Sequence, residues 1–357
     1  MIGQIEVEDV SSPESGLEQL HRRTQIGRMR QLAEVALAAY DLPQARLTLL
    51  AHLFNTTFRV DTITRQRYVL RIHRAGTPTV ESVGAEMAWL AALRRDTSLE
   101  VPAPIATRDG SFLTVASTPG VLRPHICVLF RWLPGRRLRC GVTPRHMKHV
   151  GALMAHLQNH ATQWGPPPEF ARGRVDYPIE AARWLANPFA PEVVASIQTL
   201  VASTLSGAEA EQVVAALGRI RAAEDALGQG PDAFGLIHTD LHFGNLLFGR
   251  DTVRVIDFDD CGFGPLLYDL AVMLSYILDW ADYHVLRAGL LAGYCQVRAL
   301  PVEHESYLDT FIALRRVQDA LWMLEWRKHP AIGPDWAAEA RQMLVPLSAF
   351  LAGEPLR

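Results

Sequence analysis

The chain has 357 residues, of which 49% are hydrophobic and 20% are charged, and its formal net charge is −3. This length suits two packed lobes better than one average core. The weak net charge provides no basic field for nucleic acid or an anionic membrane, so neither is expected as a partner. The four cysteines form no CxxC pair, and the N-terminal stretch lacks the features of a secretory signal. A cytoplasmic protein is therefore expected.

The first part of the chain, 1–132, is predicted to be a β-rich N-terminal lobe. Apolar residues at helical spacing predict helices over 16–41 and 80–95. Alternating β-branched stretches between turn residues predict strands over 46–54, 57–64, 67–74, 111–117 and 125–132. The lobe is therefore expected to be a mostly antiparallel sheet with one inserted helix, followed by a short linker.

The remainder, 133–357, is predicted to be a larger, mainly helical C-terminal lobe. Thr143 is a predicted N-cap for a helix over 144–161, with Pro144 at the first helical position. A strand, a loop and a hairpin are predicted over 234–257. Further helices are predicted over 179–186, 190–204, 208–228, 266–282, 283–297, 303–328 and 335–352. The expected fold class is therefore α+β with two lobes.

The stretch LIHTDLHFGNLLFGRDTVRVIDFDD, residues 236–260, contains Asp240, Asn245 and Asp257. Phosphoryl transfer needs a carboxylate that orients the attacking hydroxyl and accepts its proton. It also needs oxygen ligands that hold Mg²⁺ against the nucleotide phosphates. Asp240 suits the first role, and Asn245 and Asp257 suit the second. Their order and spacing match a kinase catalytic loop followed by a metal-binding aspartate. A surface loop of capping Asp and Asn residues is the alternative.

A second set of residues fits a nucleotide site in the N-terminal lobe. Arg71 lies in the apolar strand YVLRI, where a cation that contacts phosphates is expected, and Glu86 in the following helix can pair with it. An ordinary charge on a strand face is the alternative for Arg71. The strand over 125–132 ends just before Pro134, where a hinge would offer backbone groups to adenine.

With these motifs the sequence resembles the aminoglycoside phosphotransferase and choline kinase superfamily, which shares the protein-kinase fold. Within it, the sequence is most similar to the bacterial homoserine kinase-like and stress-response kinase-like members. The resemblance covers roughly residues 30 to 330 and is most specific at 236–260. It implies a two-lobed protein-kinase-like fold that uses ATP and Mg²⁺. It also implies Asp240 as catalytic base, Asn245 and Asp257 as Mg²⁺ ligands, and the backbone of Arg131 and Leu133 as the adenine-binding hinge.

The chain departs from the protein-kinase pattern at several positions. The first turn of the small lobe is Asn55-Thr56-Thr57 instead of a glycine-rich loop, although its N–H groups and hydroxyls can still cap phosphates. Arg71 replaces the usual lysine, and its forked guanidinium can bind two phosphate oxygens. Thr239 occupies the place of the arginine that senses a phosphorylated activation loop in many protein kinases. These departures favour a small-molecule kinase.

Acidic and aromatic residues are candidates for binding the acceptor. Asp259 and Asp260 stand beside the metal aspartate, and Trp322 and Trp326 share one face of a predicted helix. Turn-forming carboxylates and helix-packing aromatics are the alternatives. His242 either touches the acceptor or braces the loop by a hydrogen bond. Acidic groups beside aromatic walls favour an amine-bearing alcohol, such as an amino sugar, choline or an amino acid.

Three alternative functions remain open. The first is a Ser/Thr protein kinase of the stress-response type. The second is a nucleotide-binding module without catalysis, against which the presence of Asp240 with both metal ligands argues. The third is an interaction protein that uses its aromatic C-terminal helices.

Asp269, in a Pro-Leu-Leu-Tyr-Asp-Leu context, is expected to brace a buried helix start.

Overall fold

The computed structural model describes residues 21–76, 78–175, 177, 189–329 and 332–357. The described chain divides into two compact units. The smaller unit holds the described residues up to Pro134 together with Pro166–Ala171. The larger unit holds Gly135–Gly165 and the described residues from Arg172 onward.

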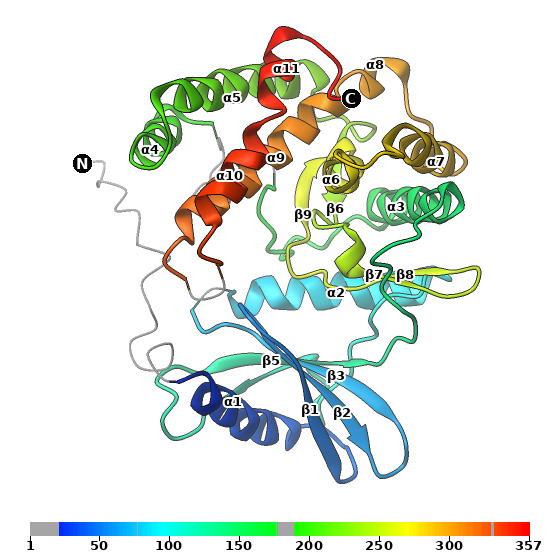
Figure 1. The fold of residues 1–357 in the computed structure, drawn as a ribbon. Coiled ribbons are helices and arrows are strands. Elements are labelled where there is room, and N and C mark those ends of the chain that lie inside the picture. Colours follow the sequence, from blue (N-terminus) through cyan, green and yellow to red (C-terminus); the bar gives the residue numbers. More distant parts are fainter. Residues whose placement is uncertain (1–20, 77, 176, 178–188, 330–331) are drawn as a thin grey trace. The chain divides into compact units, whose positions relative to one another are not determined.

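A five-stranded antiparallel sheet in the order β1-β2-β3-β5-β4 is the frame of the smaller unit (Figure 1). Strands β1 and β4 are the edges of the sheet, and β3 lies at its centre. The strands are β1 (Ala45–His52), β2 (Thr56–Thr62), β3 (Arg67–Ile72), β4 (Leu113–Ala116) and β5 (His125–Arg131). The register pairs Arg71 with Thr57 on β2 and with Val128 on β5, so Arg71 is fixed from both sides.

Two helices complete the smaller unit, α1 (Arg22–Leu37) and α2 (Val80–Asp96). Strand β2 alternates strictly between buried and half-buried residues, and its Phe58 and Val60 pack with Leu32 of α1 in one apolar core. Burial of each such side chain contributes about 1.5–3 kcal/mol. Helix α2 begins at the N-cap Thr79, whose hydroxyl accepts the N–H of Ser82 at 3.1 Å.

The larger unit is mainly helical. Helix α3 packs against α7, and α9 packs against α5, α6 and α10. Thr143 caps α3 as predicted, in a capping box with His146, and Pro144 is the first helical residue. The helices are α3 (Pro144–Trp164), α4 (Pro191–Ala202), α5 (Gly207–Leu227), α6 (Leu267–Ile277), α7 (Tyr283–Cys295), α8 (Val302–Glu305), α9 (Leu308–Glu325), α10 (Trp336–Leu344) and α11 (Leu347–Ala352).

Two short antiparallel ribbons within the larger unit carry the segment 234–265. They pair β6 (Phe234–Ile237) with β9 (Gly262–Pro265), and β7 (Leu246–Phe248) with β8 (Val253–Val255). The predicted hairpin is therefore present as β7–β8. Strand β9 was not predicted, because its glycines have low strand propensity. The structure needs them, since a Cβ at Gly264 would lie 2.4 Å from Val175 Cγ2.

The α+β architecture predicted from the sequence is confirmed, with an antiparallel sheet before Pro134 and mainly helices after it. Two predicted long helices are wrong in detail, because 303–328 is divided into α8 and α9, and 335–352 into α10 and α11. Pro346 explains the second break, since it has no N–H to continue a helix. The predicted helix over 179–186 lies outside the described residues. Among the described residues, no helix has both the length and the apolar character that crossing a bilayer requires.

Candidate active site

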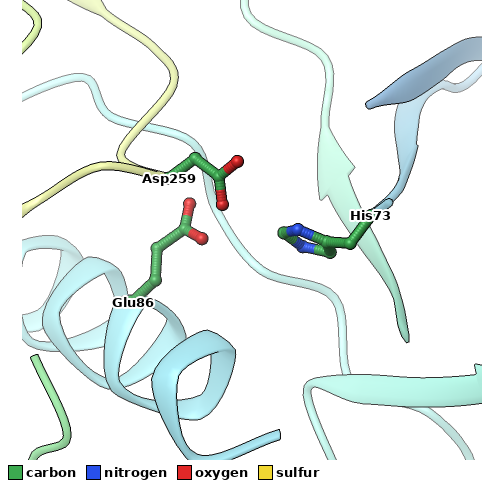
Figure 2. Close-up of side chains that lie close together, drawn as sticks. All are labelled: His73, Glu86 and Asp259. Atoms are coloured by element: carbon green, nitrogen blue, oxygen red, sulfur yellow. The ribbon is translucent and has the colours of Figure 1, made fainter. Parts of the chain in front are cut away.

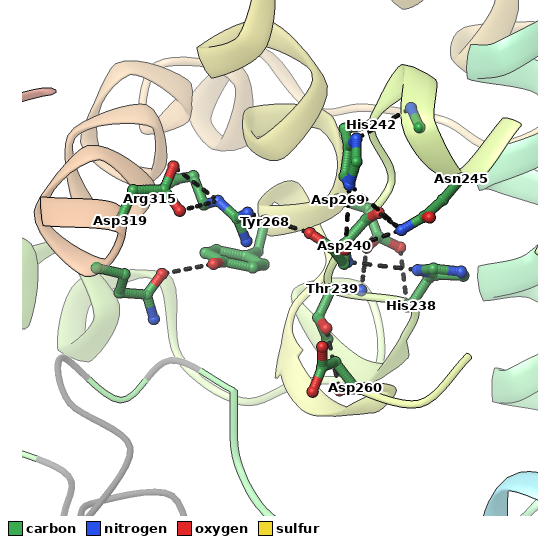
Figure 3. A network of polar contacts seen from close by, with 12 residues as sticks. His238, Thr239, Asp240, His242, Asn245, Asp260, Tyr268, Asp269, Arg315 and Asp319 are labelled. Atoms are coloured by element: carbon green, nitrogen blue, oxygen red, sulfur yellow. Dashed lines mark hydrogen bonds and ion pairs between the residues drawn. The ribbon is translucent and has the colours of Figure 1, made fainter. Parts of the chain in front are cut away.

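The loop after β6 is held in an uncommon backbone conformation. Thr239 has a φ of 76°, which is unfavourable for a β-branched residue. The carboxylate of Asp269 on α6 holds this conformation by accepting the N–H of Thr239 at 2.7 Å and the N–H of His238 at 3.2 Å. The Thr239 hydroxyl donates to the carbonyl of Asp260 at 3.0 Å. Figure 3 shows these contacts converging beneath Asp240.

Asp240 is the centre of a polar network (Figure 3). Its Oδ2 accepts the side-chain amide of Asn245 at 2.8 Å and lies 3.2 Å from Nε2 of His242. Its Oδ1 lies 3.1 Å from the guanidinium of Arg315 on α9. Burial raises the pKa of Asp240, but the hydrogen bond from His242 and the charge of Arg315 outweigh it and hold this pKa well below its usual range. Asp240 is therefore ionised near neutral pH.

Asn245 and Asp257 come from adjacent backbone segments. The N–H of Ile256 donates to the carbonyl of Asn245 at 2.9 Å, and Asp257 follows with a φ of 68° and an exposed side chain. The amide nitrogen of Asn245 is engaged by Asp240, so its amide oxygen is the atom left for other ligands. An amide oxygen and an exposed carboxylate are hard ligands that suit Mg²⁺ and leave room for its water molecules.

The His238 side chain links the loop that carries Asp240 to the segment that precedes Asp257. It is fully buried, its Nδ1 accepts the N–H of Asp240 at 3.3 Å, and its Nε2 lies 3.1 Å from the carbonyl of Ile256. Burial lowers the pKa of His238 to about 4. The imidazole is therefore neutral, which is the form that can accept one of these bonds and donate the other.

Asp269 is buried in the first turn of α6, as the sequence indicated, but its carboxylate braces the loop after β6 rather than the helix start. Burial raises its pKa to about 6, against the lowering effect of the two loop N–H groups. Gln158 of α3 lies on the same carboxylate, at 3.5 Å, and donates to the carbonyl of Leu266 at 2.9 Å. Its Oε1 accepts the hydroxyl of Tyr294 from α7 at 2.6 Å.

Arg315 and its partners were missed by the sequence analysis. The guanidinium of Arg315 lies 3.0 Å from Asp319 one turn further along α9. Burial raises the pKa of the Tyr268 hydroxyl, against the smaller lowering effect of the charge of Arg315, and this hydroxyl donates to Gln318 at 2.5 Å. The Arg-x-x-x-Asp spacing within a predicted helix was the available signal, but such pairs are common on exposed helix faces.

In the smaller unit, Arg71 and Glu86 form the predicted pair, with 2.5 Å between Nη2 and Oε2 and side chains that are 7% and 1% exposed. The Arg71 guanidinium also lies over the ring of Phe130, 5.2 Å from its centroid. Figure 2 shows the His73 ring near the Glu86 carboxylate. A ring nitrogen of His73 lies within 4.8 Å of a carboxylate oxygen of Glu86. Asp259, also labelled in Figure 2, belongs to the larger unit.

Of the other predicted phosphate-capping residues, Asn55 lies in the turn between β1 and β2, whereas Thr56 and Thr57 are the first two residues of β2 and not part of the turn. The Asn55 side chain accepts the N–H of Arg74 at 3.2 Å, and the Thr56 hydroxyl lies 2.8 Å from Nδ1 of His52. Thr57 faces Arg71 across the β2–β3 ladder. The side chains of Asn55 and Thr56 thus already have partners within the smaller unit.

The predicted hinge residues follow the end of the sheet. Arg131 is the last residue of β5, its N–H donates to the carbonyl of Ala103 at 2.9 Å, and its guanidinium lies 5.7 Å from the centroid of the Tyr68 ring. Leu133 is half-buried and follows in irregular backbone. After Pro134, Gly135 has a φ of 142°, and a Cβ there would lie 2.8 Å from Cβ of Leu247.

The residues predicted for the acceptor are dispersed within the larger unit. His242 stacks on Tyr276 of α6 with ring centroids 4.5 Å apart, and its Nδ1 accepts the N–H of Gly244 at 3.0 Å, so both ring nitrogens brace the loop. The carbonyls of Asp259 and Asp260 accept Arg172 at 2.6 Å and Thr239 at 3.0 Å, respectively. Trp322 is 36% exposed and Trp326 only 6%, so Trp326 belongs to the packing core.

The fold is that of the protein-kinase-like phosphotransferases that transfer phosphate to a hydroxyl of a small molecule. The family model described as the phosphotransferase enzyme family (APH) matches residues 46–306, and the chain belongs to this family.

Relatives and solved structures agree with this membership. An uncharacterized protein of Deinococcus radiodurans is 30% identical over 301 residues, which cover 82% of this chain and 80% of the relative. The structure of a microcompartment-associated aminopropanol kinase is 28% identical, with a TM-score of 0.77, and covers 92% of this chain and 99% of that one. An amicoumacin kinase in complex with AMP-PNP, Ca²⁺ and Ami is 16% identical, with a TM-score of 0.73, and covers 94% of this chain and 97% of that one.

Proposed function

We propose that this chain is an ATP- and Mg²⁺-dependent kinase that phosphorylates a hydroxyl of a small, amine-bearing alcohol. The observation that carries the proposal is the bond of 2.8 Å between the Asn245 amide and Asp240. It brings the proposed base and one proposed metal ligand together, and phosphoryl transfer uses both groups. Asp240 orients the acceptor hydroxyl and takes its proton. The acceptor oxygen then bonds to the γ-phosphorus as the bond from phosphorus to the leaving ADP oxygen breaks.

The remaining residues have supporting roles in this proposal. Asn245 and Asp257 would hold Mg²⁺, which neutralises charge on the nucleotide phosphates. Arg71, fixed by Glu86, neutralises the phosphates that are not transferred, and its fork can contact two oxygens. The hinge backbone at Arg131 and Leu133 would bind adenine, as the family resemblance implies.

An amine-bearing acceptor is supported by the charges near Asp240. Asp240 and Asp319 share the single guanidinium of Arg315, so these three groups carry a net charge of −1. An acceptor ammonium would balance that charge. Tyr276 is 46% exposed and stacks on His242, and an exposed ring face beside carboxylates suits an ammonium group. The names of the aminopropanol and amicoumacin kinases, and the resemblance to homoserine kinase-like members, point in the same direction.

The test is ADP release by the purified protein with Mg²⁺-ATP and a panel of acceptors. The panel contains 1-amino-2-propanol, ethanolamine, choline, homoserine and an aminoglycoside, with 1,2-propanediol as the neutral match and casein as a protein acceptor. We expect an amine-bearing alcohol to be favoured. Preference for the neutral diol would refute the amine requirement, and preference for casein would favour a protein kinase.

Variants separate catalysis from binding. Asp240→Asn is expected to lower turnover by about 10²–10⁴-fold, the usual contribution of a positioned base, and to leave ATP binding within about twofold. Asp251→Asn, in the exposed β7–β8 turn, is the matched control and should behave as wild type. Unchanged turnover in Asp240→Asn would refute the base assignment. ATP binding without turnover in the wild-type protein would favour a non-catalytic nucleotide-binding module.

A further inference from the structure

The hydrogen bonds of Asp240 leave a defined place for the acceptor. A carboxylate offers about four lone-pair positions, two on each oxygen. Among the described residues, Oδ2 faces two donors, Asn245 and His242, whereas Oδ1 faces one, Arg315. The position that remains is on Oδ1, the oxygen that contacts α9. An acceptor hydroxyl that donates to Asp240 therefore binds beside the guanidinium of Arg315.

Arg315 is itself held firmly. Its side chain is 16% exposed, and it contacts Asp319 at 3.0 Å on α9 and Asp240 at 3.1 Å. Near the guanidinium, the hydroxyl of Tyr268 on α6 donates a hydrogen bond to Gln318 at 2.5 Å. The planar guanidinium is therefore held between two carboxylates, and a fixed fork orients a carboxylate more strictly than a flexible ammonium does.

We propose that Arg315, anchored by Asp319, is a positioning residue that fixes the Oδ1 edge of Asp240 for the incoming acceptor hydroxyl. The proposal rests on the proposed role of Asp240 as the base. Without Arg315 the carboxylate keeps Asn245 and His242 on Oδ2 but loses the contact that fixes its plane. A displacement of about 1 Å at a reacting group lowers the rate by about 10²-fold, because few bound complexes then have the reactive geometry.

The chain contains a matched control for this role. Arg316, the next residue of α9, is also buried, at 4% exposure, and it donates to the carbonyl of Ser275 at 2.8 Å and to Asp279 at 3.2 Å. Arg316 has a comparable structural environment but makes no contact with Asp240. Loss of stability alone should therefore affect Arg316→Ala and Arg315→Ala alike, whereas loss of positioning should affect Arg315→Ala alone.

The experiment measures Mg²⁺-ATP turnover with 1-amino-2-propanol and with water as acceptors, together with ATP affinity by calorimetry. Arg315→Ala is expected to lower kcat by about 10²-fold with ATP affinity within about twofold, and Arg315→Lys should retain part of the rate. Added ethylguanidinium, which can occupy the vacated space, should restore kcat of Arg315→Ala about tenfold or more. It should have no effect on Arg316→Ala.

Three results would overturn the proposal: a wild-type kcat in Arg315→Ala, an equal loss in Arg316→Ala, or no restoration by ethylguanidinium. If Arg315→Ala does not fold, Asp319→Asn replaces it, with the same expected loss of kcat. The Asp240→Asn variant distinguishes a failure of the base assignment from a failure of the positioning role of Arg315. Normal turnover in Asp240→Asn overturns the base assignment itself, whereas impaired Asp240→Asn with normal Arg315→Ala overturns only the positioning role.

Discussion

The contact between α3 and α7 depends on glycines, and replacing Gly293 by alanine tests how close these helices are. A Cβ at Gly293 would lie 1.9 Å from the carbonyl oxygen of Lys148 and 2.6 Å from its carbonyl carbon. Carbon atoms pack at about 3.5–4.0 Å, so α7 has to move away from α3. The obstacle is backbone, which cannot rotate aside as a side chain could.

The expected magnitude combines two opposing effects. Overpacking of a buried contact costs about 1–3 kcal/mol, and alanine regains up to about 1 kcal/mol over glycine inside a helix. Gly293→Ala should therefore lower the free energy of unfolding by up to about 2.5 kcal/mol relative to wild type, and by about 1–3 kcal/mol relative to a glycine-to-alanine change without overpacking. The control is Gly218→Ala in α5, where a new Cβ has no neighbour within 4 Å, and only the helix-propensity gain of about 0.5–1 kcal/mol is expected.

Urea unfolding monitored by circular dichroism measures both variants, with equal slopes required for the comparison. The displacement should also reach the loop that carries Asp240, because Tyr294 adjoins Gly293 and holds Gln158, which lies against Asp269. Gly293→Ala should therefore lower turnover even in the folded protein. Equal stability of Gly293→Ala and Gly218→Ala would show that α3 and α7 are not in such close contact.

Three further predictions concern protonation, ion pairing and metal binding. The folded pKa of His238, about 4, lies below the unfolded value of about 6.5, so stability is lost as pH falls through this window. Relative to His238→Gln, urea unfolding should show a loss of about 3 kcal/mol between pH 7 and pH 4; a constant difference would contradict it. Glu86→Gln removes the carboxylate that lies 2.5 Å from the buried Arg71 guanidinium and should destabilise the protein by about 3 kcal/mol. Asp251→Asn removes a charge from an ion pair with Arg145, whose side chains are 71% and 58% exposed. It should change the free energy of unfolding by under about 0.5 kcal/mol. Equal losses in Glu86→Gln and Asp251→Asn would refute the idea that the buried pair matters more than the exposed one. Asp257→Asn should raise the Mg²⁺ concentration for half-maximal turnover about tenfold or more; an unchanged Mg²⁺ titration would exclude Asp257 as a ligand.

The contacts of the site that could be predicted from the sequence are those between residues that lie close together along the chain. Asp240 and Asn245 lie in one loop, five positions apart, so their order alone indicates kinase-like chemistry. Arg71 and Glu86 are 15 positions apart, on a strand and the helix that follows it, and this supersecondary unit fixes their approach. The fold class was predictable for the same reason, since alternation and helical periodicity are local patterns.

Contacts made by distant helices could not be predicted in this way. Arg315 reaches Asp240 across 75 positions, and Asp269 reaches Thr239 across 30. Each depends on how α6 and α9 pack on the loop, which no local spacing encodes. Strand β9 is a related case, because its glycines are selected by the close approach of Val175 and not by strand propensity.

These long-range contacts imply that the loop after β6, which carries Asp240, does not determine its own conformation. The left-handed backbone at Thr239 is unfavourable by about 1–2 kcal/mol and persists because Asp269 on α6 binds its N–H. The side chain of Asp240 is in turn oriented from α9 by Arg315. One helix thus fixes the backbone of the loop, and the other fixes the carboxylate. Since α6 and α9 pack on each other, a change at their interface should alter both at once and lower kcat before it lowers ATP affinity.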